Sequence, residues 1–103
     1  MIDWNKDIYL CEGPFDALFL NNSIPLLGKK MSDLLFETLY EKAKGKITIV
    51  LDGDAWEDAK RLYFKLSGGK LYGKIKVVKL PVDNDIADMR GVIPEDSYIE
   101  LER

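Results

Sequence analysis

Two aspartates follow directly after an apolar segment near the middle of the chain. Residues 47–51 are Ile, Thr, Ile, Val and Leu, and Asp52, Gly53 and Asp54 come next. Two carboxylates this close repel each other unless a cation or a hydrogen-bond donor lies between them. The cation that clustered carboxylate oxygens prefer is a hard divalent ion, Mg²⁺ first. The segment therefore predicts a magnesium site, although Asp and Gly are also ordinary residues of a turn that caps the next helix.

The rest of the composition leaves carboxylates as the obvious charged groups for chemistry. The chain has no histidine and a single cysteine, Cys11. The lack of histidine excludes histidine-based catalytic triads and histidine-ligated zinc or iron. A single cysteine forms no disulfide within the chain, so we expect Cys11 to be a small buried side chain in a reducing compartment.

Length and hydropathy predict one soluble domain. Hydrophobic residues make up 47% of the 103 residues and charged residues 32%, which is ordinary for a globular protein with one core. No apolar run approaches the roughly 20 residues that a membrane span needs, and we see no signal peptide. We therefore expect a cytoplasmic protein without membrane contact, with residues 1–103 forming a single domain.

Charge is distributed unevenly along the second half of the chain. The formal net charge is −3, but residues 60–79 carry seven basic side chains and no acid, and residues 81–103 carry seven acids and two arginines. A basic segment beside an acidic one predicts a surface that attracts phosphate next to a metal site. A solvated helix face followed by a loop would give the same pattern.

Apolar periodicity and turn residues predict the elements that would position these groups. A short apolar run without alternation suits a strand covered on both faces, whereas apolar residues three and four apart suit a helix. Residues 83–91 are expected to form a loop. The expected strands are residues 7–12, 24–27, 47–52 and 75–80, and the expected helices are residues 15–21, 31–44, 55–67 and 95–102.

This order predicts an α/β fold with a four-stranded, mostly parallel, Rossmann-like sheet and helices on both faces. Right-handed crossovers bring the carboxyl ends of parallel strands to one edge, where ligands bind in such sheets. Because acids from three separate segments fall at these ends, a shared metal site explains them better than three unrelated turns. These acids are Glu12, Asp52, Asp54, Asp85 and Asp88.

The same residues resemble the signature of the Toprim family, the catalytic domain of DnaG-type primases, topoisomerases and OLD-type nucleases. Glu12-Gly13 is similar to the E-G motif that ends the first strand of that family, and Asp52-Gly53-Asp54 is similar to its D-x-D motif. Residues 12–17 resemble the DnaG-type version, in which a second acid, here Asp16, follows four residues after the glutamate. Residues 80–89 resemble the primase segment that ends in a D-P-x-D-like motif. The resemblance covers nearly the whole chain.

The chain departs from the primase pattern at three places. Trp56-Glu57 follows the D-x-D motif where primases usually have an Ala-Gly step, and Ile86 replaces the usual proline. No cysteine cluster is present for the zinc module of such primases. The resemblance therefore implies either a piece of a larger bacterial or phage primase or a small stand-alone Toprim protein.

The resemblance implies nucleotidyl transfer with Mg²⁺, or Mn²⁺ as its substitute, as in RNA primer synthesis for DNA replication. It implies that Glu12 is the general base or orients a metal-bound water. The residues that it assigns to catalysis are Glu12, Asp16, Asp52 and Asp54, and those that it assigns to the metal are Asp52, Asp54, Asp85, Asp88 and Glu12.

The implied partners are a single-stranded DNA template, nucleoside triphosphates and a replicative helicase. Four basic side chains are candidates for contacts with phosphate, and for each of them an ordinary exposed charge is the alternative. These candidates are Lys29, Lys30, Lys60 and Arg61.

Two other functions remain open at this point. A small Toprim nuclease would use the same carboxylates, with water in place of a hydroxyl as the attacking group. A RecR-like module would bind nucleic acid or a replication partner without catalysis. The match at Asp16 favours the primase, and the presence of Glu12 argues against a mere binding module.

Overall fold

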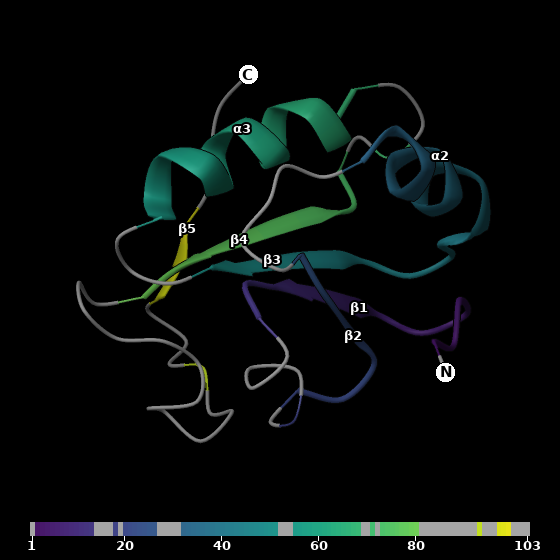
Figure 1. The fold of residues 1–103 in the computed structure, drawn as a ribbon, viewed down its shortest axis with the longest axis horizontal. Coiled ribbons are helices and arrows are strands. Elements are labelled where there is room, and N and C mark those ends of the chain that lie inside the picture. The colour runs from purple at the N-terminus through teal and green to yellow at the C-terminus, as the bar shows by residue number, and fades with distance from the viewer. Residues whose placement is uncertain are drawn as a thin grey trace.

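Five strands form one sheet in the part of the chain that the structure, a computed structural model, describes: residues 2–13, 18, 20–26, 32–51, 55–68, 71, 73–80, 93 and 97–99. The strands are β1 (Ile8–Cys11), β2 (Ser23–Pro25), β3 (Ile47–Leu51), β4 (Ile75–Lys79) and β5 (Tyr98–Ile99), and the described helices are α2 (Asp33–Lys42) and α3 (Trp56–Leu66) (Figure 1). The order across the sheet is β2-β1-β3-β4-β5, with β5 alone antiparallel to its neighbour. The prediction of an α/β fold with a mostly parallel sheet is confirmed.

The last strand corrects the expectation of a helix over residues 95–102 and of a sheet with four strands. Tyr98 and Ile99 pair with Val78 and Val77 of β4. Tyrosine and isoleucine favour extended backbone, and pairing with β4 satisfies their backbone polar groups. A strand of two residues leaves no periodicity in the sequence, so its conformation depends on the neighbouring strand.

β3 is buried along its whole length because both of its faces carry a core. Ile47, Ile49 and Leu51 belong to the larger apolar cluster, which includes side chains of α2 and α3. Val50 belongs to a second cluster together with Cys11. Two buried faces account for the uninterrupted apolar run. Cys11 is fully buried, which confirms the expected small buried side chain.

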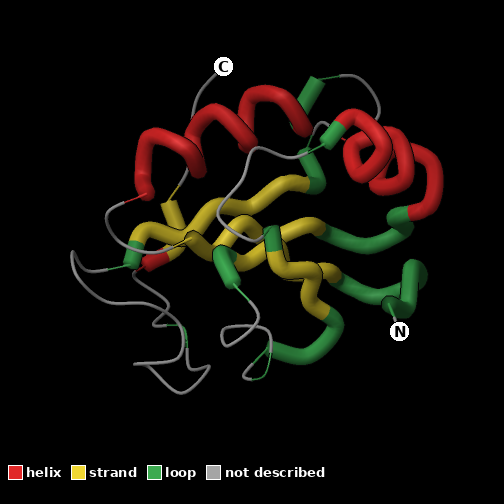
Figure 2. The backbone as a smooth tube through the Cα atoms, viewed as in Figure 1, coloured by secondary structure: helices red, strands yellow, loops and turns green. Residues whose placement is uncertain are grey.

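Both described helices cover the same face of the sheet (Figures 1 and 2). The connections from β2 to β3 and from β3 to β4 move in the same direction across the sheet, so right-handed crossovers put both helices on one side. The two helices also contact each other, since Lys65 Nζ lies 3.7 Å from the Asp33 carboxylate. Helices on both faces are therefore not seen among the described residues, and most of the expected helix at residues 15–21 lies outside them.

Local signals account for the ends and faces of the helices. The Ser32 hydroxyl accepts the N–H of Leu35 at 3.1 Å and caps the start of α2. In α3, the buried residues Ala59, Leu62 and Leu66 recur at intervals of three and four and face the sheet. Neither of these described helices is long and apolar enough to cross a membrane.

Hydrogen bonds from side chains to the backbone tie together the amino ends of β1, β2 and β3, which we call the amino edge. Asn22, just before β2, donates to the carbonyl oxygens of Asp3 (2.9 Å) and Asp7 (2.8 Å). Its amide oxygen accepts the N–H of Asp3 at 2.7 Å. The Asp7 carboxylate, just before β1, accepts the N–H of Lys46 at 2.9 Å. Gly45 packs so closely here that an added Cβ would stand 2.6 Å from Asp7 Oδ1.

Candidate functional site

The carboxyl ends of β1, β3 and β4 lie side by side and form the edge opposite to the amino edge (Figure 1). Cys11 at the end of β1 pairs with Val50, and Leu51 at the end of β3 pairs with Lys79 at the end of β4. The three parallel strands therefore end within one residue of each other. Neighbouring strands are roughly 4.8 Å apart, so side chains that follow them are within reach of one bound ligand. We call this region the carboxyl edge.

The chain direction changes between β1 and β3. β1 leads to β2 on one side of the sheet, whereas β3 leads to β4 on the other side. In open α/β sheets, ligands bind beyond the carboxyl ends of the strands at such a switch in direction, because the connecting segments diverge there and leave a crevice. The topology thus identifies the space beyond the ends of β1 and β3 as the candidate site.

Glu12 is the one predicted acidic site residue that the described part of the chain contains. It is half-buried and follows β1 directly, beside the end of β3. The Cys11 thiol approaches two carbonyl oxygens beneath this turn, Gly13 at 3.7 Å and Ile24 at 3.8 Å. A Cβ added at Gly13 would meet no atom within 4 Å. The backbone after β1 is therefore supported from the core and has space on its other side.

The other predicted acids lie outside the described residues, and their roles stay predictions. Along the chain, Asp52 immediately follows Leu51, the last residue of β3. Within the described ranges, no three His, Cys, Asp or Glu side chains are grouped so that they could hold a metal ion. The predicted site residues that are not described are Asp16, Asp52, Asp54, Asp85, Asp88, Lys29 and Lys30.

Lys60 and Arg61 lie near the middle of α3, each with a carboxylate partner on the same helix. Lys60 Nζ lies 3.0 Å from the Glu57 carboxylate, and Arg61 donates to Asp58 at 3.1 Å. Both are pairs between residues three apart on an exposed helix face, which stabilise a helix only slightly. A phosphate would have to compete with these carboxylates. The geometry therefore gives no support to the predicted phosphate contacts of Lys60 and Arg61.

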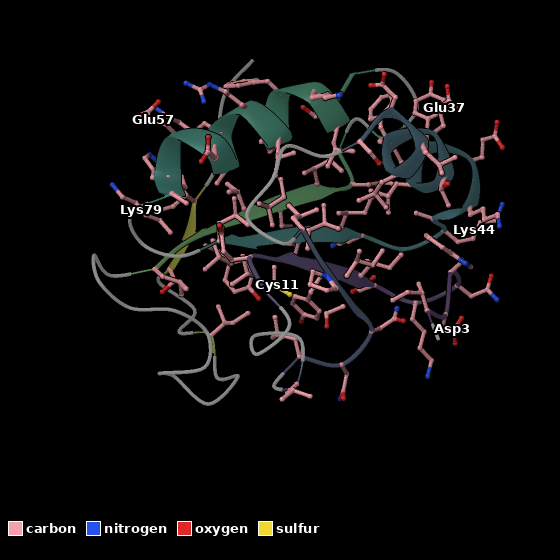
Figure 3. The ribbon with its side chains drawn as sticks, in the orientation of Figure 1. Asp3, Cys11, Glu37, Lys44, Glu57 and Lys79 are labelled. Atoms are coloured by element: carbon pink, nitrogen blue, oxygen red, sulfur yellow. The ribbon has the colours of Figure 1, made fainter. Side chains whose placement is uncertain are left out.

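A lysine that sequence reasoning did not select lies closer to the carboxyl edge. Lys79 is the last residue of β4, and its Nζ lies 5.2 Å from the centroid of the Trp56 ring at the start of α3. Figure 3 shows Lys79 at the same end of the sheet as the first turn of α3. The sequence indicates only a lysine that ends an apolar strand, and its position beside Leu51 requires the register of the sheet.

The other face of β4 carries a second lysine–aromatic pair away from this site. Lys76 Nζ lies 5.7 Å from the centroid of the Tyr98 ring on β5. Partial burial raises the pKa of the Tyr98 hydroxyl above its ordinary value, and the charge of nearby Tyr9 raises it further. This pair is a structural counterpart of the pair between Lys79 and Trp56.

Comparisons with known proteins identify no relative of this chain. No family model, no curated protein and no solved structure matches the chain at a significant level. The topology of the sheet and the residues at its carboxyl edge are therefore the basis on which a function can be assigned.

Proposed function

We propose that the chain binds Mg²⁺ at the carboxyl edge and transfers nucleotidyl groups on nucleic acid, as the catalytic Toprim domain of a DNA primase does. The observation that carries the proposal is the parallel pairing of β1 with β3. Glu12 directly follows one of these strands, and Asp52 directly follows the other in the sequence. Because the two strands are neighbours that end together, acids about 40 residues apart in the chain can serve one ligand.

The chemistry of the proposed donor set suits magnesium. The donors are carboxylate oxygens, the chain has no histidine, and its single thiol is buried beneath the edge. Such hard oxygen donors favour Mg²⁺ over softer transition metals. Asp52, Asp54 and Asp85 would hold the ion, which supplies positive charge for the phosphates of the substrate.

Glu12 takes the role of general base in this proposal. Its carboxylate would accept the proton of the attacking 3′-hydroxyl as the bond to the α-phosphorus of the incoming nucleotide forms and the bond from that phosphorus to the leaving pyrophosphate breaks. The position directly after a buried strand suits this role, because β1 is held on both sides by β2 and β3. A base on a rigid strand end keeps its distance to the attacking oxygen better than one on a long loop.

Calorimetric titration with Mg²⁺ and Mn²⁺ tests the metal site. We expect heat of binding for the unchanged chain, no binding for Asp52→Asn and largely retained binding for Glu12→Gln. Glu37→Gln is the matched control, because Glu37 is an exposed carboxylate on α2 at the opposite end of the molecule (Figure 3). Absence of heat at millimolar metal, or full binding by Asp52→Asn, would overturn the proposal.

Product analysis then separates primer synthesis from hydrolysis. Single-stranded DNA is incubated with labelled nucleoside triphosphates and Mg²⁺, and the products are resolved by length. Short RNA products that depend on Glu12 support the primase assignment. Shortened template without new RNA would show that water is the attacking group and would replace the primase assignment with a nuclease.

A further inference from the structure

The carboxyl edge contains a cation that lies against an aromatic ring. Lys79 Nζ lies 5.2 Å from the centroid of the Trp56 ring, and the attraction between a cation and the face of an indole ring restrains the flexible side chain. Lys79 also pairs with Leu51, the residue that precedes Asp52. The ammonium group is therefore anchored one strand away from the proposed metal site.

Lys79 differs from the cations of α3 in its charge partners. Lys60 and Arg61 are each within 3.1 Å of a carboxylate, whereas no carboxylate of the described residues forms an ion pair with the exposed Lys79. A ring restrains an ammonium group without taking its N–H donors, so these donors remain available to an anion. An anion would therefore compete with a carboxylate of the helix at Lys60 and Arg61, but with none of the described carboxylates at Lys79.

The start of α3 adds positive potential at the same place. α3 runs for 11 residues from Trp56, and its N-cap residue Ala55 makes no side-chain hydrogen bond to the first turn. The free N–H groups of a helix start attract anions. Two acids in this turn, Glu57 and Asp58, oppose the effect, but each is paired with a cation of the helix. The lysine and the helix start therefore act in the same direction.

We infer that Lys79, positioned by Trp56, binds a phosphate of the nucleotide or of the nucleic acid strand at the carboxyl edge. The inference rests on the proposed function and names a contact for its anionic substrate. Lys79 donates to a phosphate oxygen and holds it beside the end of β3. Trp56 keeps the ammonium group at the edge and would report a bound phosphate through its fluorescence.

The two tryptophans of the chain give a way to locate the ligand. Trp56 lies at the carboxyl edge, whereas Trp4 lies near the amino edge with Lys42 Nζ 5.8 Å from its ring centroid. Trp4→Phe leaves Trp56 as the single reporter, and Trp56→Phe leaves Trp4. We expect adenosine triphosphate with Mg²⁺, or a short thymidine oligonucleotide, to change the emission of Trp56 and to leave that of Trp4 unchanged. The two probes distinguish a nucleotide phosphate from a strand phosphate.

Matched lysine variants in the Trp4→Phe background test the contact itself. Lys79→Met should weaken binding of the effective probe roughly tenfold and reduce the slope of log affinity against log salt by about one for the oligonucleotide. Lys76→Met is the control, because Lys76 is also an exposed lysine of β4 beside a ring, on the other face. It should change affinity by less than about twofold. Lys79→Arg should restore most of the affinity, since it keeps the charge and the ring contact.

The inference and the proposed function fail in different experiments. Equal affinities of Lys79→Met and Lys76→Met, a response of Trp4 alone, or no binding of either probe would overturn the inference. Calorimetric titration with Mg²⁺ alone tests the proposed metal site, and its result does not depend on whether Lys79 binds a phosphate. Thermal melting of each variant shows whether an affinity change reflects unfolding. A destabilised variant would not show a smaller salt slope, and its affinity would not be restored by Lys79→Arg.

Discussion

Asp7 and Glu12 are carboxylates that flank the same strand, one directly before β1 and the other directly after it. At the amino edge, Asp7 and Asn22 direct their polar atoms at the backbone of neighbouring segments. At the carboxyl edge, Glu12 lies at the switch in chain direction, and Lys79 is exposed with a ring beneath it. One edge thus uses side chains to close the sheet, whereas the other carries the exposed Lys79 near the switch in chain direction.

Changing each of these carboxylates to its amide gives the largest expected contrast. Glu12→Gln should lower primer synthesis by about 100-fold or more, because the amide cannot accept a proton. Its effect on the free energy of unfolding should stay within about 0.5 kcal/mol. Asp7→Asn should leave synthesis unchanged and lower stability by about 0.5 kcal/mol, because its amide oxygen can still accept the Lys46 N–H. Steady-state rates and urea unfolding measure the two effects.

Full activity of Glu12→Gln would remove the general base from the proposed mechanism. Loss of activity in Asp7→Asn without loss of folding would show that the amino edge also takes part in chemistry, and the division between the edges would be wrong.

Two glycines allow the same comparison for packing. An alanine Cβ at Gly45 would stand 2.6 Å from Asp7 Oδ1 and 2.9 Å from the Asp7 backbone nitrogen. The backbone must shift, so we expect Gly45→Ala to lower the free energy of unfolding by about 2 kcal/mol. Gly13→Ala at the carboxyl edge meets no atom within 4 Å and should change stability by less than about 0.5 kcal/mol. Urea unfolding of both variants is the measurement, and similar losses would contradict the expected difference.

The sequence was sufficient to predict those strands and helices that a pattern of neighbouring residues defines. The apolar run at residues 47–51 predicted a strand covered on both faces, and apolar residues three and four apart predicted the helix at residues 55–67, in which Ala59, Leu62 and Leu66 are buried. The acid after the first strand was likewise visible in the sequence as the end of an apolar run, and the structure shows Glu12 directly after β1.

Features that depend on pairing between distant segments were not predictable from these patterns. The side on which a helix lies follows from strand order, which no local periodicity contains. The strand at Tyr98 exists through its pairing with Val78. The contacts of Asn22 join residues up to 19 positions apart, and Lys79 reaches the carboxyl edge through its register with Leu51.

Asn22 gives a smaller test of the amino edge alone. Asn22→Ala removes its two hydrogen bonds as donor and one as acceptor, and it places alanine at a φ of 56°. We expect a loss of about 1 to 2 kcal/mol of stability, measured by urea unfolding, because the bonds are solvent-exposed. Asn22→Gly is the control that keeps this backbone conformation accessible while removing the side chain. If Asn22→Gly were as stable as the unchanged chain, the hydrogen bonds would contribute nothing.

The smallest expected effect concerns Tyr98 on the face of the sheet away from both described helices. Its pKa in the folded chain is raised above the ordinary value of 10.0, first by burial and then by Tyr9. The unfolded chain therefore loses this proton at lower pH than the folded chain. The contribution to stability is fully present below about pH 10 and declines as the pH rises through the folded-state pKa. Urea unfolding between about pH 9 and pH 11 should show a shallower decline for Tyr98→Phe than for the unchanged chain. An equally steep decline in the variant would mean that other groups, and not Tyr98, couple folding to alkaline pH.

The affinity of the carboxyl edge for Mg²⁺ at neutral pH should be the same in the unchanged chain and in Tyr98→Phe, because the phenol ring lies on the face of the sheet opposite to Lys79.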